Sequence, residues 1–209
     1  VHPQNLELCL NFIDENNSDF VHYSKQSFKN KTEIKFQKHK KSSVDFKIDI
    51  YDIYDSIIGK LGLASCTILW RKHVFDDHKF NESLQYAEEW DLYNRVLING
   101  FKGFKIKEVL YFNKKHSDSN TASYYKKNPI RIQSKIEACV SIIKSLDKNN
   151  LLDKAYVKFF LGLRHKSESQ PIYKALMESK SLNVKGKLYT FIRYTFLPQF
   201  KYLFSLKNN

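Results

Sequence analysis

The 209-residue sequence is poor in the residues that bend or interrupt structure, with only 6 Gly and 4 Pro. That scarcity excludes a fibrous or linker-rich protein, while 42% hydrophobic residues, among them 16 Phe and 13 Tyr, are enough for a packed core. The only cysteines are Cys9, Cys66 and Cys139. They lack the C-x-x-C or Cys/His spacing of a zinc site, so we expect free thiols in a reducing compartment.

Familiar catalytic signatures are also missing from the sequence. There is no G-x-x-x-x-G-K-[ST], G-x-G-x-x-G, G-x-S-x-G or H-E-x-x-H, which disfavours phosphate-loop enzymes, dinucleotide enzymes, serine hydrolases and zinc proteases. No signal peptide and no run of about 18 apolar residues occurs, so neither secretion by that route nor a membrane span is supported.

Positive charge is concentrated in the second part of the sequence. The net charge is +13, and residues 126–209 contain 17 Lys and Arg against 5 Asp and Glu, whereas residues 1–125 are nearly neutral. Such an excess indicates an anionic partner, for which nucleic acid and a membrane surface are the two candidates.

Residues 1–123 mix helical and strand patterns. Apolar spacing predicts helices over about 3–14, 48–62 and 86–99. The second is expected to end at Gly59 or Gly62, and the last is capped by Gly100. Strands are predicted at 19–24, 63–70 and 102–115, and the lysine-rich residues 25–47 are expected to form a loop or a solvated edge. We therefore expect an α/β fold with a mixed sheet and flanking helices.

From Tyr124 onward the pattern is helical almost throughout, over about 124–148, 151–165, 170–180 and 185–206. The composition changes near Ser123. The sequence thus predicts a domain of residues 1–123 followed by a basic helical region of residues 124–209.

Three carboxylates, Glu88, Glu89 and Asp91, fall in the first turn of the helix predicted over 86–99. Negative side chains are favoured at a helix N-terminus, so an acidic first turn needs no function to explain it. The alternative is that one of them faces a cleft as a general base.

Two other acidic groups are better explained as solvated side chains than as metal ligands. Asp49, Asp52 and Asp55 recur along one helical face, and Asp76 and Asp77 lie beside His78 in a predicted turn.

Three phrases in a fixed order carry a resemblance to a known family. They are "SCTILWRKHVF", "FNESLQYAEEWDLYNRVLINGFK" and "VLYFNKKHSDSNTAS". This order resembles the acceptor-side half of family 2 glycosyltransferases of the GT-A fold over residues 60–123. The opening, "VHPQNLELCLNFIDENNSDFVHYS", is similar to the family's segment just after its metal-binding Asp-x-Asp. The resemblance implies transfer of a sugar, with inversion, from a nucleotide-sugar donor to a glycan or lipid-linked acceptor, in bacterial-type surface polysaccharide synthesis.

The resemblance also implies roles for the acidic turn. Glu88 and Glu89 occupy the family's Glu-Asp pair, whose second member is the usual catalytic base, so Glu89 is the expected base with Glu in place of the commoner Asp. Asp91 and Arg95 match the following acidic and basic positions and are expected to support the first turn as an i, i+4 ion pair. Trp90 and Arg95 are expected near the acceptor, although Trp90 could equally be a core anchor.

Contacts to the donor are implied for a further group of residues. Arg71, Lys114 and Lys115 are expected near the diphosphate, and His116 falls where some members place a metal ligand or a diphosphate contact. The Mg²⁺ or Mn²⁺ that the resemblance implies would be held mainly by an Asp-x-Asp, which these 209 residues do not contain. Because the sequence also begins without Met, we expect a fragment that lacks the nucleotide-binding half and is inactive alone.

The basic aromatic segment Gly186–Lys207 is expected to contact an anionic membrane surface peripherally. The alternative is a helix packed on its own domain with a lysine-rich outer face. For the whole enzyme we expect a cytoplasmic location, peripheral on the inner face of the cell membrane, and no nucleic-acid partner. The rival hypothesis is a non-catalytic basic module that binds nucleic acid or an anionic membrane.

Overall fold

The protein is described by a computed structural model over residues 1–28, 34–38, 43–114, 126–163 and 169–205, without the side chains of 197–205. It divides into two compact units. The first contains Val1–Asn81 and Leu92–Asn128, and the second contains Glu82–Asp91 and Pro129–Asn209. The domain boundary predicted at Ser123 lies outside the described residues.

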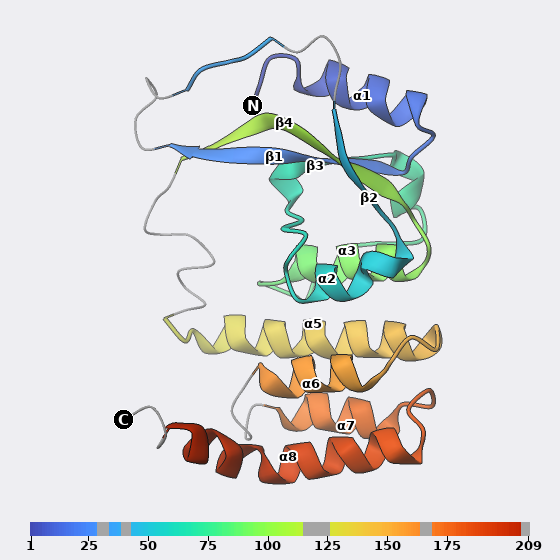
Figure 1. Cartoon of the computed structure of the whole chain (residues 1–209), viewed down its shortest axis with the longest axis vertical. Coiled ribbons are helices and arrows are strands. Elements are labelled where there is room, and N and C mark those ends of the chain that lie inside the picture. The colour runs from blue at the N-terminus through green and yellow to red at the C-terminus, as the bar shows by residue number, and fades with distance from the viewer. Residues whose placement is uncertain (29–33, 39–42, 115–125, 164–168, 206–209) are drawn as a thin grey trace. The chain divides into compact units, whose positions relative to one another are not determined.

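The first unit is built on a four-stranded mixed sheet (Figure 1). Its strands are β1 (Phe20–Phe28), β2 (Val44–Ile48), β3 (Ile68–Trp70) and β4 (Gly103–Lys114), in the order β2-β4-β1-β3. The central strands β1 and β4 are parallel, and each edge strand pairs with its neighbour in the antiparallel direction. The predicted mixed sheet with flanking helices, followed by helices at the C-terminal end, is confirmed.

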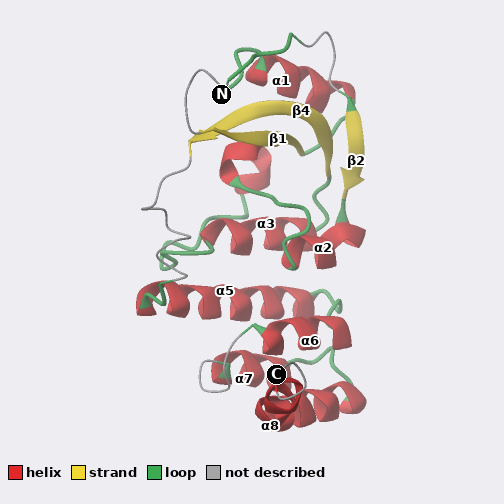
Figure 2. Ribbon diagram, turned by 60° about the vertical axis from the view of Figure 1, so that its left-hand side comes forward, coloured by secondary structure: helices red, strands yellow, loops and turns green. Residues whose placement is uncertain are grey.

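Helices cover both faces of this sheet (Figures 1 and 2). α1 (Asn5–Glu15) lies on one face. Its buried residues pack against inward residues of the two central strands, and the cluster contains Leu8, Cys9, Phe12, Ile13, Val21, Tyr23, Ile106 and Leu110. The other face carries α2 (Ile53–Ile57) and the Leu92–Ile98 part of α3 (Glu88–Ile98). There the Trp70 ring lies 4.5 Å from Phe20 and 5.1 Å from Tyr93.

The pairing of β1 with β4 begins with a close backbone approach and continues through a bulge. A Cβ atom at Gly103 would lie 2.4 Å from the carbonyl oxygen of Phe20, so only glycine fits there. Further along, His22 pairs with Lys105 but Ser24 pairs with Val109, so β4 carries extra residues at this point. The irregularity shifts the pairing with β1, while burial within β4 still alternates from Ile106 to Leu110.

Two expectations for residues 25–62 differ from the structure. β1 continues to Phe28, and β2 occupies the end of the stretch that was predicted as loop or solvated edge. The helix predicted over 48–62 is divided into a 3-10 turn (Ile50–Asp52) and α2, because Asp49 and Asp52 form a reciprocal capping box at the start. Gly59 then ends the segment with φ of +84°.

The second unit is a set of helices that follow the predicted pattern: α5 (Pro129–Lys148), α6 (Lys154–Gly162), α7 (Gln170–Glu178) and α8 (Val184–Ser205). Asp153 caps α6 by accepting hydrogen bonds from the N–H groups of Ala155 and Tyr156. The carboxylate of Asp147, near the end of α5, accepts from the N–H groups of Lys180 and Ser181 and thereby fixes the connection between α7 and α8.

Candidate functional site

The first turn of α3 begins from a strained residue. Ala87 has φ of +66°, a left-handed conformation that its Cβ disfavours, and its carbonyl accepts the first helical hydrogen bond, from the N–H of Asp91 at 2.9 Å. Such a conformation costs about 1–3 kcal/mol and is common at functional sites. It fixes the direction in which α3 starts, and therefore where Glu88 and Glu89 are placed.

Burial separates the three carboxylates of this turn. Asp91 is fully buried, and every residue from Leu92 to Ile98 is buried except Arg95. Glu88 and Glu89 are half-exposed. Among the acidic residues of α3, only these two can therefore meet a ligand from solvent, and Asp91 is placed to support the turn from inside.

The same turn is anchored within the second unit by α5 and α6. The N–H of Gln85 donates to the hydroxyl of Ser134 at 3.0 Å. The ammonium of Lys135 lies 3.1 Å from the centre of the Trp90 ring, and the Phe160 ring meets Trp90 edge-on with centroids 6.5 Å apart. This gives Trp90 a packing role, one of the two roles expected for it, and its contact with an acceptor stays a prediction.

In the first unit, Arg95 holds the loop that precedes α3. Its guanidinium donates to the carbonyl of Lys79 at 2.8 Å. Burial and the positive charge of Arg95 lower the pKa of His78, although Asp77 acts in the opposite direction. The predicted ion pair of Arg95 with Asp91 stays a prediction.

Arg71 binds the end of α1. Its Nε donates to the carbonyl of Ser18 at 3.0 Å, and one terminal nitrogen contacts Asp14 at 2.7 Å and the carbonyl of Ile13 at 3.3 Å. A cation at this place satisfies carbonyl groups at a helix C-terminus. The guanidinium thus already has a structural role.

Lys114 lies at the other end of the sheet from Arg71. The N–H of Arg71 donates to the carbonyl of Asp19, just before β1 starts, whereas Lys114 pairs with Phe28 at the end of β1. Eight residues of strand separate these two ends by roughly 25 Å. One diphosphate cannot contact both, so at most one of the two has the predicted role. Ligands of open α/β sheets bind at the carboxyl ends of the strands, which favours the end at Lys114.

The other two residues expected near the donor, Lys115 and His116, lie outside the described residues. Among the residues that are described, no group of three or more His, Cys, Asp or Glu side chains could hold a metal ion. The divalent metal that the resemblance implies stays a prediction.

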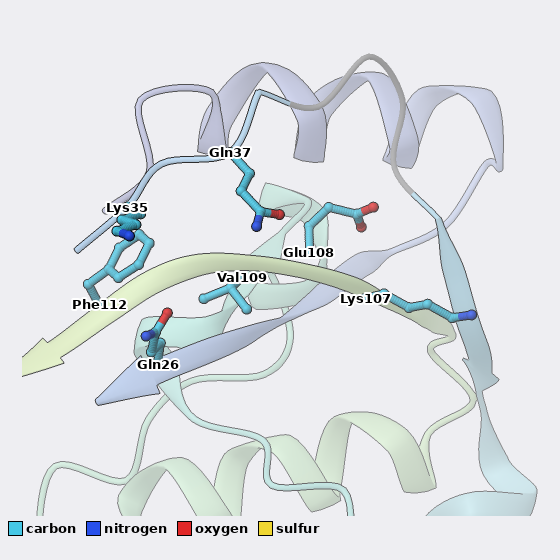
Figure 3. Close-up of a pocket in the computed structure, with 7 residues that line it drawn as sticks. All are labelled: Gln26, Lys35, Gln37, Lys107, Glu108, Val109 and Phe112. Atoms are coloured by element: carbon cyan, nitrogen blue, oxygen red, sulfur yellow. The ribbon is translucent and has the colours of Figure 1, made fainter. Parts of the chain in front are cut away.

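A cavity of about 230 Å³ in the first unit was not anticipated from the sequence (Figure 3). It lies along β4 beside the 34–38 segment and is lined by Gln26, Lys35, Gln37, Lys107, Glu108, Val109 and Phe112. Lysine and amide donors together with a carboxylate suit a polar ligand. The 34–38 segment is held in place by His2, whose Nε2 lies 2.9 Å from the carbonyl oxygen of Gln37.

Glu108 is the least expected member of this lining, because it is a buried carboxylate in the middle of a strand. One of its oxygens accepts from the N–H of Ser43 at 2.8 Å, which links β4 to the residue before β2. Burial, with a contribution from the Glu108 charge, raises the pKa of the Cys9 thiol to about 12. Cys9 is thus a protonated, unreactive core residue.

Comparison with known proteins gives a distant structural similarity and no match by sequence. No protein-family model and no curated protein matches the sequence. Among solved structures, the protein is similar to S. aureus TarS 1–349 in complex with UDP-GlcNAc, with 16% identity and a TM-score of 0.42. The match covers 86% of this chain and 54% of that chain, so the protein spans about half the length of that structure. At this level, similarity does not define a function, and the function has to be argued from the residues.

Proposed function

We propose that these residues form the acceptor-side half of an inverting GT-A glycosyltransferase, which transfers a sugar from a nucleotide-sugar donor to a glycan or lipid-linked acceptor. One observation carries the proposal. At the position where the family phrase has its base, α3 presents two half-exposed carboxylates directly after a strained residue, and the rest of the helix is almost wholly buried.

In this proposal Glu89 acts on the acceptor hydroxyl. Its carboxylate takes the hydroxyl proton while the acceptor oxygen forms a bond to the anomeric carbon. The bond from that carbon to the diphosphate oxygen breaks on the opposite side, and the leaving nucleoside diphosphate takes the bonding electrons. Attack from the side opposite the leaving group inverts the anomeric configuration.

Glu in place of the commoner Asp lengthens the base by one methylene group, so the acceptor would sit slightly further from the helix. Asp91, buried beneath the turn, and Ala87, which sets its direction, would position Glu89 without touching the substrate. Trp90 would fix the same turn through Lys135 and Phe160.

The remaining parts of the proposal concern groups beyond the described residues. A Mg²⁺ or Mn²⁺ ion would stabilise the departing diphosphate. It would be held mainly by an Asp-x-Asp that this sequence does not contain, with His116 as a further ligand or diphosphate contact, and no step above depends on it. Surface polysaccharide synthesis, a cytoplasmic location and a peripheral contact with the membrane belong to the same proposal.

The test uses Glu89→Gln and Glu88→Gln in the enzyme that carries these residues together with its donor-binding half. The two changes are chemically identical and adjacent, so each is the control for the other. We expect Glu89→Gln to lower kcat by about 10²- to 10⁴-fold, with nucleotide-sugar binding unchanged, since it removes proton transfer alone. Glu88→Gln should retain most of the activity.

Near-normal transfer by Glu89→Gln would exclude Glu89 as the base. If both variants transfer normally, the acidic turn is only a favourable helix N-terminus. A protein that binds no nucleotide sugar but binds nucleic acid in a salt-dependent way would support the rival basic module instead.

A further inference from the structure

The outward face of α8 is apolar. Val184, Leu188, Phe191, Ile192 and Phe196 are between 42% and 83% exposed. Their spacing of four, three, one and four residues places them along one side of the helix. We call these five residues the apolar stripe. Isolated exposed apolar residues are ordinary, but a continuous row of five along one helix needs an explanation.

The face of α8 that packs on the second unit is made of small and polar residues. Gly186 is buried, and Thr190 is fully buried with its hydroxyl donating to the carbonyl of Gly186 at 2.8 Å. The Tyr194 ring stacks on Tyr173 of α7 with centroids 4.1 Å apart. An ordinary surface helix turns its aliphatic side inward. Packing of α8 on α6 and α7 therefore does not use the apolar stripe.

Positive charges border the apolar stripe. On a helical projection with Val184 at 0°, the apolar stripe extends from about −20° at Phe191 to about 120° at Phe196. Lys187 lies beyond one edge at about −60°, and Lys185 lies near the other edge at about 100°. On α6, the ammonium of Lys154 lies 6.0 Å from the ring of Tyr189, which adds a third cation next to α8. The sequence of α8 contains Lys and Arg but neither Asp nor Glu.

We infer that α8 lies in the interface of an anionic lipid bilayer, with the apolar stripe among the acyl chains and the bordering lysines at the lipid phosphates. This combination distinguishes a bilayer from other anionic partners, because nucleic acid would be bound by the cations without need of five aliphatic and aromatic side chains. A second copy of the protein would bring like charges together around the stripe. No helix among the described residues is long and apolar enough to cross a membrane, and an interfacial helix does not need to be.

The inference rests on the second unit and deepens the membrane contact of the proposed function. It can fail or succeed separately from the transferase activity, since binding to a bilayer is measured without any sugar donor. The test is cosedimentation of the 209-residue protein with vesicles of phosphatidylcholine alone, and of phosphatidylcholine with one third phosphatidylglycerol. We expect strong binding only to the second kind of vesicle, weakening as salt is raised.

Two sets of variants separate the apolar and the charged contributions. Leu188→Gln with Phe191→Gln should weaken binding to anionic vesicles by about tenfold or more, because it replaces two of the five inserted apolar side chains with polar ones. Lys185→Gln and Lys187→Gln should each weaken it about fivefold. The matched control is Leu6→Gln with Leu10→Gln, two exposed residues of α1, which should bind as the unaltered protein does.

Circular dichroism spectra and melting curves first establish that each variant is folded, which is expected because the replaced residues are exposed, or half-exposed in the case of Lys187. Equal binding to both kinds of vesicle, or an equal loss in the α1 control, would overturn the inference. The inference would also be overturned if the protein bound no vesicle and instead formed a dimer that Leu188→Gln with Phe191→Gln dissociates. The apolar stripe would then be the contact with a second copy. A third contrary result is binding to RNA that Leu188→Gln with Phe191→Gln does not weaken, together with no binding to vesicles. The positive charges would then serve nucleic-acid binding.

Discussion

The stability of the first unit should depend on the protonation of one buried histidine. His22 lies in β1 and is only 4% exposed. Burial, followed by the positive charges of Lys105 and Lys25, lowers its pKa from 6.5 to about 4. Within the described part of the protein, its Nδ1 makes no hydrogen bond, so no partner compensates a charge on the ring.

The sign and size of the effect follow from proton linkage. As the pH falls through 6.5, a histidine in the unfolded chain takes up a proton, but His22 in the folded protein stays neutral until about pH 4. The unfolded state binds the extra proton, so the free energy of unfolding decreases on acidification. At about 1.4 kcal/mol per pKa unit, His22 should remove about 2 kcal/mol between pH 7 and pH 5, and about 3 kcal/mol once the pH is below 4.

The assay compares urea unfolding of the protein and of His22→Gln at pH 7 and pH 5. A Trp90→Phe background leaves Trp70, which contacts the sheet, as the fluorescent reporter of the first unit. The His22→Gln variant also loses the packing of the imidazole ring, but this loss of stability is the same at both pH values. It therefore cancels when each protein's free energy of unfolding at pH 5 is compared with its own value at pH 7. The contributions of other titrating groups cancel in the difference between the two proteins.

We expect the protein with His22 to lose about 2 kcal/mol more than His22→Gln on going from pH 7 to pH 5. Lys25→Gln should reduce this difference, because removing a nearby positive charge lets the ring be protonated more easily. Equal losses in the two proteins would refute the reasoning. A His22 ring that titrates near pH 6.5 in an NMR titration of the folded protein would refute it as well.

Three further predictions, one of them with a matched control, concern the urea midpoint. Gly103→Ala should destabilise the first unit by about 3 kcal/mol, since the added methyl meets the Phe20 carbonyl. Burial alone would raise the pKa of Asp147, but hydrogen bonds from Ser181 and from backbone N–H groups outweigh burial and lower that pKa. Asp147→Asn should therefore reduce the free energy of unfolding by about 2 kcal/mol at pH 7. This reduction should become smaller in acid, where the carboxylate of the unaltered protein is protonated. Ala87→Gly should be neutral or stabilise by up to about 1 kcal/mol by relieving strain, whereas Ala155→Gly on an ordinary helix should destabilise by a similar amount.

Apolar periodicity predicted the helices and strands in which the apolar residues of the sequence pattern are also the residues that the fold buries. α3 and β4 lie where the apolar spacing placed them, and Gly100 between them has φ of +89°, as a helix-terminating glycine should. The four helices from Pro129 onward also lie approximately within the predicted ranges, and α5, α6 and α7 each bury one apolar face against their neighbours. In these segments local preference and packing favour the same structure.

β2 was missed because its stability comes from its partner. Val44–Ile48 is short, and most of its residues are exposed or half-exposed, so the alternation is weak. Its hydrogen bonds to β4 involve residues about sixty positions away, which no local pattern reveals. The end at Gly59 is one of the two that were predicted for the helix at 48–62. The division of that helix has a local cause instead, since Asp49 and Asp52 use their side chains to start a separate turn.

The buried carboxylate in the Figure 3 cavity could have been predicted. Glu108 is in phase with Ile106 and Leu110, so the alternation of β4 already places a charged side chain on the buried side of the strand. A charge at such a position requires a partner, and here the Ser43 N–H is one. In contrast, no pattern in the sequence connects Arg71 with the end of α1, because that contact depends on the fold.

The outward apolar stripe of α8 and the accessible first turn of α3 also depend on the fold and could not be predicted from local sequence patterns. Sequence spacing shows which residues share a side of a helix, but the remainder of the fold decides which side is covered. In α8 this leaves the aliphatic side outside, and in α3 it buries Asp91 while Glu88 and Glu89 stay half-exposed. The resemblance selects Glu89 by its position in the family phrase. Independently of the resemblance, the burial of Asp91 leaves two of the three carboxylates as candidates for the base. Because neighbouring helical residues point about 100° apart, Glu88 and Glu89 cannot both face one acceptor hydroxyl in the same way. A base at this turn therefore requires that one of the two glutamine variants lose activity and the other keep it.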